Sequence, residues 1–187
     1  MLTLIHSFDM PYENVLEYHN AFACTNYSDI NCYAIRLTSI SKKRYFDWLS
    51  RYGDGMYYLV DDTNPNYIIG FGSFEDSSVI DFHEEYLNIG HISYGIRPNE
   101  RLKGYGTKLL ELLLIKCEES GMPEVCISCK NSNVASEKII LKNGGVFEKN
   151  FYGDFDGYGL KYWIKLHPKI KNKINRFKKT HELNKEN

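Results

Sequence analysis

The stretch from residue 94 to 120 restricts the fold more than any other part of the sequence. A segment with strand character ends at Pro98, a short basic loop follows, and two glycines, Gly104 and Gly106, coincide with the start of a long helical pattern. The helix is apolar over more than half of its circumference, so we expect it to lie deep against a sheet. The chain must therefore build a fold in which a strand, a glycine loop and a buried helix follow one another.

This junction has the features of an anion site. The first turn of a helix presents unsatisfied backbone N–H groups and the positive end of a dipole. Glycines let a ligand approach the backbone closely, so the loop suits a phosphate or a pyrophosphate. The alternative is that both glycines serve only the geometry of the helix start. A dinucleotide-binding fingerprint is excluded because Leu109 replaces its third glycine, and the sequence contains no P-loop segment.

Periodicity and turn signals place further elements on both sides of this junction. They predict an α/β fold of mixed α+β character, in which one mixed, mostly antiparallel sheet carries helices on both faces. A single domain is expected over 1–166, followed by a basic tail, 167–187, which either docks as a helix or stays solvated. The predicted helices are 12–22, from Thr38 or Ser39 to Leu49, 104–120 and 133–143, and the predicted strands are 56–60, 67–74, 89–96, 125–129, 146–150 and 160–166.

Charge and cysteine content narrow the class of protein. The net charge is −1, but residues 165–187 carry eight Lys or Arg and two Glu, which gives 8 − 2 = +6 and leaves −7 for residues 1–164. We expect no nucleic-acid partner for this acidic body, although the tail could bind RNA.

Five cysteines without a regular framework indicate reduced thiols in a cytoplasmic protein and no metal site. No apolar run reaches transmembrane length, so no membrane association is expected.

Several motifs resemble the GNAT superfamily of N-acetyltransferases. The segment 101–106, Arg-x-x-Gly-x-Gly between a strand and a long helix, resembles the family's pyrophosphate-binding signature. The segment 133–136, Asn-Val-Ala-Ser, followed by the glycine turn at 142–145, is similar to the family's next helix. The sequences of residues 90–98 and 162–164 resemble those of one poorly characterised bacterial branch of the superfamily. The resemblance covers about residues 56–166.

The resemblance implies the GNAT fold, with a sheet splayed in the middle, and acetyl-CoA as co-substrate. Backbone amides of the glycine loop would hold the pyrophosphate, and the pantetheine arm would lie between the strand at 94–96 and the strand at Val125. The N–H near Gly95 or Ile96 would polarise the thioester carbonyl. The implied cofactor-binding residues are Tyr94, Gly95, Ile96, Arg97, Arg101, Leu102, Lys103, Gly104, Tyr105, Gly106, Thr107, Asn133 (to the pantetheine amides) and Ser136 (near the thiol).

The resemblance also implies direct attack of a primary amine on the thioester in a ternary complex. The family's tyrosine acid falls on Ile140 here, so Tyr105, Tyr152, Tyr158 or a water would have to replace it. Glu85 and His91 are weak candidate bases, because a solvated loop charge and a structural histidine are the simpler explanations of these two residues.

Acidic residues in turns favour a cationic small-molecule or peptide acceptor, unless they serve only solubility. The residues are Asp61, Asp62, Glu75, Asp76, Asp81, Glu84 and Glu85. A homodimer is a reasonable assembly for a chain with exposed edge strands. The alternative function is a catalytically weak GNAT-fold module that binds acetyl-CoA or a partner as a sensor or interaction domain.

Overall fold

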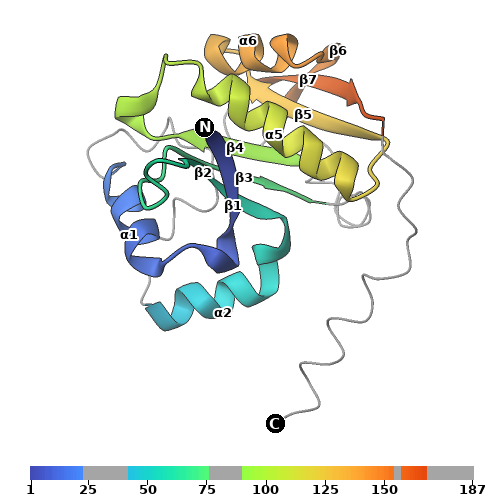
Figure 1. Ribbon diagram of the computed structural model, residues 1–187. Coiled ribbons are helices and arrows are strands. Elements are labelled where there is room, and N and C mark those ends of the chain that lie inside the picture. The colour runs from blue at the N-terminus through green and yellow to red at the C-terminus, as the bar shows by residue number, and fades with distance from the viewer. Residues whose placement is uncertain (23–41, 76–89, 154–156, 168–187) are drawn as a thin grey trace.

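Two antiparallel sheets form the centre of the protein (Figure 1). The computed structural model describes residues 1–22, 42–75, 90–153 and 157–167. The first sheet has the order β1-β2-β3-β4 and the second the order β5-β7-β6. The strands are β1 (Leu2–His6), β2 (Met56–Asp61), β3 (Gly70–Phe74), β4 (Ile92–Ile96), β5 (Glu124–Lys130), β6 (Val146–Gly153) and β7 (Gly157–Lys165).

Helices cover the sheets (Figure 1), and the buried residues form two hydrophobic cores. The helices are α1 (Tyr12–Asn20), α2 (Lys42–Tyr52), α5 (Tyr105–Glu119) and α6 (Val134–Lys142), with short 3-10 turns η1 (Ser7–Asp9), η4 (Gly53–Gly55) and η5 (Pro98–Glu100). α1 and α2 pack on one side of the first sheet, where Tyr18, Leu49, Tyr58 and Phe71 are buried together. α5 and α6 share the other core with residues of both sheets, which include Leu59, Ile92, Ile127 and Ile164.

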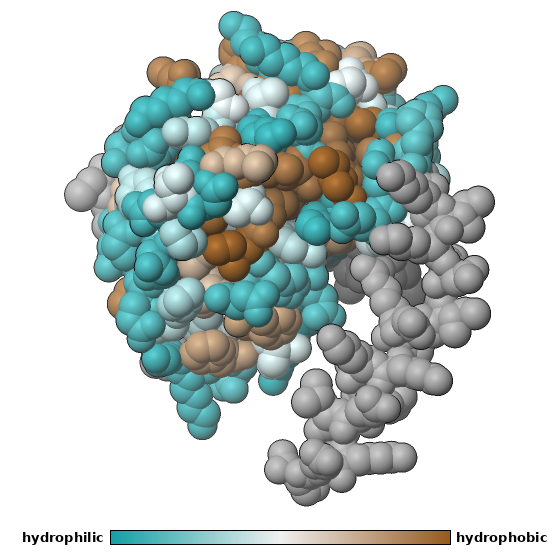
Figure 2. Space-filling view, in the orientation of Figure 1, coloured by the Kyte–Doolittle hydropathy of each residue, from teal (hydrophilic) through white to brown (hydrophobic). Residues whose placement is uncertain are grey.

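The apolar pattern of α5 explains its central place. Leu109, Leu110, Leu113 and Cys117 have no exposed surface, and they recur at the spacing of one helix face. Gly121 adopts a φ of +89° just after the helix and ends it. The outer side of α5 still carries apolar surface, seen as brown in Figure 2 along the course that the helix takes in Figure 1. α5 therefore connects the two sheets as a shared buried element.

β4 and β5 separate from each other between the two sheets. They are joined by an isolated bridge between Gly90 and Ile127 and by two hydrogen bonds of His91. The His91 N–H donates to the Cys126 carbonyl at 2.7 Å, and the Cys126 N–H donates to Nδ1 of the buried His91 ring at 2.8 Å. Beyond this point β4 pairs only with β3. His91 therefore fixes the point from which the strands diverge.

Most of the predicted elements are present, and the splayed, mostly antiparallel arrangement with helices on both faces is confirmed. Three expectations need correction. The first strand, β1, was not predicted, β3 begins at Gly70 rather than at Tyr67, and the single sheet is divided in two. The predicted helix start at Thr38 or Ser39 and the tail after His167 lie outside the described residues.

Replacing His91 with leucine tests its role at the divergence point. The buried Cys126 N–H would lose its acceptor, so we expect the free energy of unfolding to fall by about 1–3 kcal/mol in urea denaturation. His91→Asn is the matched control, because its side-chain oxygen can accept the same hydrogen bond and should recover part of the loss. Equal losses in both variants would contradict this role.

Candidate functional site

The loop from Arg101 to Gly104, which we call the glycine loop, is exposed and holds two left-handed residues. Gly104 has a φ of +85°, and a Cβ there would meet no atom within 4 Å. The need for glycine at this position is therefore conformational rather than steric. Leu102 also has a positive φ, 63°, and its side chain is fully exposed. No packing contact of its side chain compensates this backbone strain, which is a feature often found at ligand sites.

The first turn of α5 directs unpaired amides at the glycine loop. The first intrahelical hydrogen bond runs from the Lys108 N–H to the Gly104 carbonyl at 3.3 Å. The amides of Tyr105, Gly106 and Thr107 therefore have no intrahelical acceptor, and no side chain in the described part of the chain caps this helix end. Gly106 is buried, and a Cβ there would lie 2.7 Å from Cδ1 of Ile139 on α6. This glycine keeps α5 and α6 in close contact.

β4 presents alternate backbone groups on the side of β5. The Arg97 N–H donates to the Ile69 carbonyl, and the His91 carbonyl accepts from Glu75, which makes the odd-numbered residues of β4 the partners of β3. The peptide groups of Tyr94 and Ile96 consequently face β5. The Ile96 carbonyl accepts a hydrogen bond from Nε of Arg101 at 3.3 Å, and the Gly95 carbonyl accepts one from the Tyr18 hydroxyl at 3.3 Å.

The start of α6 meets β4 through two hydroxyl groups. Asn133 caps α6, since its Oδ1 accepts the Ser136 N–H at 3.0 Å. The Ser136 hydroxyl lies 2.8 Å from the hydroxyl of Tyr94. Burial raises the pKa of Tyr94 to about 12, although the hydrogen bond with Ser136 acts to lower it. The phenol is therefore protonated at neutral pH and can serve only as a neutral donor or acceptor.

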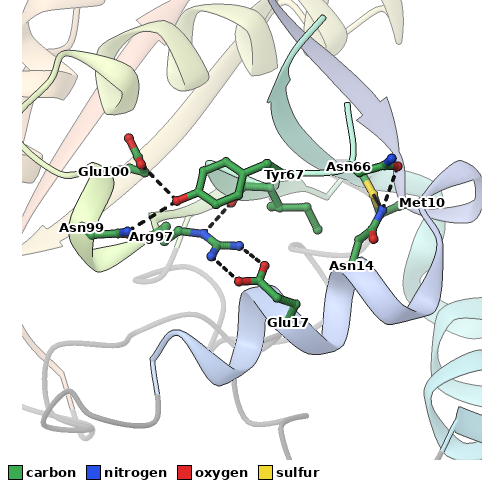
Figure 3. Close-up of polar contacts among 9 residues, drawn as sticks. Met10, Asn14, Glu17, Asn66, Tyr67, Arg97, Asn99 and Glu100 are labelled. Carbon is green, nitrogen blue, oxygen red and sulfur yellow. Dashed lines mark hydrogen bonds and ion pairs between the residues drawn. The ribbon is translucent and has the colours of Figure 1, made fainter. Parts of the chain in front are cut away.

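Arg97 is placed differently from the other basic residues of the segment (Figure 3). Only 3% of its surface is exposed, and its guanidinium makes a two-pronged contact with the carboxylate of Glu17 on α1. Its Nε donates to the Ile68 carbonyl at 2.7 Å, and the guanidinium lies 4.2 Å from the ring centre of Tyr67. The Arg97 side chain therefore does not reach the glycine loop, because it joins α1 to the end of β4.

Further contacts lead from Arg97 through Tyr67 to Asn99 and Glu100, just before the glycine loop (Figure 3). The hydroxyl of Tyr67 donates to Glu100 at 3.0 Å, and Asn99 donates to the same hydroxyl at 3.4 Å. Glu100 pairs with Lys103 at 2.9 Å, and this contact lowers the pKa of Glu100 and raises that of Lys103. Side chains of the loop are thus connected to α1 through buried and half-buried partners.

Only one of the two candidate bases, His91, belongs to the residues that the structure describes. Glu85 lies outside the described residues. Nδ1 of His91 accepts the Cys126 N–H at 2.8 Å, so this ring nitrogen takes part in a hydrogen bond between β5 and the residue before β4. The structure therefore gives His91 a structural role. Of the substitute acids, Tyr152 and Tyr158 are 70% and 67% exposed and contact each other, and Tyr105 is half-buried at the first position of α5.

Sequence reasoning missed two groups near these elements. His19 on α1 is 3% exposed, neither of its ring nitrogens has a hydrogen-bond partner among the described residues, and burial lowers its pKa to about 4. The Tyr94 hydroxyl was overlooked because Tyr94 was considered only for its backbone. The sequence alone does not indicate either feature. The burial of His19 depends on the fold, and so does the contact between Tyr94 and Ser136, which are 42 residues apart.

Two of the seven acidic residues taken as a sign of a cationic acceptor have local partners. Asp61 and Asp62 both contact the N-terminal ammonium of Met1, and Asp61 also accepts from Thr63. Among the residues that the structure describes, no group of three or more His, Cys, Asp or Glu could hold a metal ion. None of the described helices is both long enough and apolar enough to cross a membrane.

A family model described as acetyltransferase (GNAT) domain matches residues 13–146. This span includes α1, the glycine loop, α5 and α6. A search of curated proteins gives no significant match to the chain.

Solved structures with the same fold include several bacterial acetyltransferases. An N-acetyltransferase from Staphylococcus aureus Mu50 superposes with a TM-score of 0.58 at 18% identity, over 89% of this chain and 99% of that one. RimL, a ribosomal L7/L12 alpha-N-protein acetyltransferase in complex with coenzyme A, gives 0.62 at 17%, over 90% and 96%. The yncA protein of Salmonella typhimurium with its cofactor acetyl-CoA gives 0.56 at 14%, over 91% and 96%.

The contact between Arg97 and Glu17 predicts unequal effects of two substitutions. Arg97→Lys loses the two-pronged contact and the bond to Ile68, so we expect the free energy of unfolding to fall by about 1–3 kcal/mol. Glu17→Gln should cost less than about 1 kcal/mol, because the Glu17 side chain is 57% exposed and solvent screens its charge. Urea denaturation measures both, and a larger loss for Glu17→Gln would contradict the assignment.

The same pair predicts a pH dependence. The hydrogen bond from Arg97 lowers the pKa of Glu17 below its ordinary value. A carboxyl group with a lowered folded-state pKa stabilises the protein above its unfolded pKa of about 4.3, and this contribution is lost as pH falls through the folded value. The stability difference between the parent protein and Glu17→Gln should therefore be largest above about pH 5 and shrink on acidification. A difference that grows in acid would argue against the pair.

Proposed function

The chain belongs to the acetyltransferase (GNAT) family, and we propose that it moves an acetyl group from acetyl-CoA to a primary amine. The observation that carries the proposal is the set of unpaired amides where the exposed glycine loop meets α5. These amides and the positive end of the helix dipole suit the diphosphate of coenzyme A. Arg101 and Lys103, both exposed, would add positive charge beside it.

The open side of β4 supports a position for the pantetheine arm. The Tyr94 and Ile96 peptide groups face β5, so an extended ligand with amide groups can pair with them as an added strand does. The Ile96 N–H is the better candidate for the thioester carbonyl than that of Gly95, because the Gly95 peptide group pairs with Phe71 of β3. Asn133 and Ser136 at the start of α6 would border the arm from the other side.

The expected reaction is direct attack of the neutral amine on the thioester carbon. An alkylammonium ion has a pKa of about 10.4 and must lose a proton first. His19, with a pKa of about 4, is too weak a base for this task, and Nδ1 of His91 is engaged with the Cys126 N–H. We therefore assign the proton removal to Glu85 or to a water on the acceptor side. A cationic acceptor remains part of the proposal, supported by the acidic body of the chain.

Binding and turnover of acetyl-CoA test this function. We expect calorimetry to detect binding of coenzyme A, and we expect a panel of small amines and of peptides with free amino groups to release thiol from acetyl-CoA. The rival function is a sensor that binds acetyl-CoA without turnover, and it is favoured if binding occurs while no amine releases thiol. A protein that does not bind coenzyme A would contradict both functions.

Charge substitutions in the glycine loop test the place of the diphosphate. We expect Arg101→Ala and Lys103→Ala each to weaken coenzyme A binding by about tenfold, because each removes a charge-assisted contact worth roughly 1.5 kcal/mol. Lys116→Ala is the matched control, since Lys116 lies in the last turn of the same helix and pairs with Glu119. Equal weakening by all three substitutions would place the diphosphate elsewhere.

A further inference from the structure

The hydroxyl of Tyr94 lies where three elements around the strand separation meet. Tyr94 is on β4 between Ile92 and Ile96, all three of which contribute to the core beneath α5 and α6. Its hydroxyl contacts Ser136 on α6 at 2.8 Å, and Tyr94 packs against the core that includes Cys129 of β5. β4, β5 and α6 therefore converge around Tyr94.

The chemistry at this position needs a hydrogen-bond donor. When an amine attacks a thioester, the C–N bond forms, the C–S bond breaks, and its electron pair goes to sulfur. A sulfur that leaves inside a protein has little water around it, so a positioned donor lowers the barrier for its departure. The peptide groups of Tyr94 and Ile96 lie on the same side of β4, so a thioester whose carbonyl pairs with the Ile96 N–H would have its sulfur in the region between β4 and β5 that Tyr94 borders.

We propose that the Tyr94 hydroxyl donates a hydrogen bond to the sulfur of acetyl-CoA as the C–S bond breaks, and that Ser136 holds the phenol for this purpose. The inference rests on the proposed acetyl-CoA site. In the pair of hydroxyls either oxygen can donate, so a bond donated by Ser136 leaves the phenol proton free for sulfur.

The proton balance follows from the acidities. The Tyr94 phenol has a pKa of about 12, whereas a simple thiol has one of about 8.5. The proton therefore stays on the phenol oxygen while its hydrogen bond stabilises the thiolate, and coenzyme A leaves as thiolate or takes its proton from solvent. The proton lost by the ammonium ends in solvent, so no further reactant is needed.

Another buried tyrosine of the same core is less suited to this role. Tyr162 on β7 also has a pKa raised by burial to about 12, but its hydroxyl donates to the carboxylate of Glu137 at 2.8 Å. A proton already shared with a carboxylate is not available to sulfur. Tyr152 and Tyr158 are exposed at the ends of β6 and β7.

Titration of the thiol of bound coenzyme A tests the inference without any acceptor. The measurement uses the full chain saturated with coenzyme A, the ultraviolet absorbance of the thiolate, and subtraction of the same protein with desulfo-coenzyme A. We expect Tyr94→Phe to raise the pKa of the bound thiol by about one unit, a tenfold loss of thiolate stabilisation. Ser136→Ala should produce a smaller rise.

Tyr45→Phe is the matched control, because Tyr45 is a buried tyrosine whose hydroxyl also meets another hydroxyl, that of Tyr58, but in the opposite core. It should leave the pKa of the bound thiol unchanged. An unchanged thiol pKa in Tyr94→Phe with intact coenzyme A affinity would overturn this inference alone. A larger rise in Ser136→Ala than in Tyr94→Phe would assign the donor to the serine and overturn it as well. Absence of coenzyme A binding in the parent protein would overturn the proposed function and this inference together.

Discussion

The divergence of β4 from β5 is the constraint on which the proposed site depends. Two neighbouring strands of one continuous sheet would pair the backbone groups that they direct toward each other. Here His91 and Cys126 bond at one end, and the peptide groups of Tyr94 and Ile96 turn toward β5 beyond it. The cost of separating the strands is offset by α5, which buries apolar residues from both sheets in one core. The opening is thus a property of packing and not of a loop.

Arg97 gives the site a second source of rigidity. A guanidinium that is almost fully buried is tolerated only when its donors are satisfied, and here Glu17 and the Ile68 carbonyl accept from it. Its partners are Glu17 on α1, the Ile68 carbonyl and the ring of Tyr67. The Tyr67 hydroxyl in turn donates to Glu100, which lies just before the glycine loop. The position of the glycine loop is therefore tied to the helix that also holds Tyr18 against Gly95.

The parts of the fold that local sequence controls were predictable, and the parts controlled by distant partners were not. The spacing of leucines and the two glycines predicted α5 and the loop before it. β1 was missed because five residues at the chain start carry too little alternation to be distinguished from a coil. The resemblance places Arg97 among the cofactor-binding residues, and nothing in the local sequence shows that its side chain pairs with Glu17, 80 residues away. The contact between the hydroxyls of Tyr94 and Ser136 could not be predicted either, because the two residues are 42 positions apart in the sequence.

The open side of β4 also bears on how this protein avoids self-association. An unpaired strand edge on the outside of a protein recruits strands from other molecules and promotes aggregation. The open peptide groups of Tyr94 and Ile96 instead face β5 of their own chain, and α5 and α6 pack over the same region. A strand from another molecule would have to displace β5 or the helices to reach these groups. The same orientation that would let the proposed pantetheine arm pair with β4 therefore also protects the chain against aggregation through this strand.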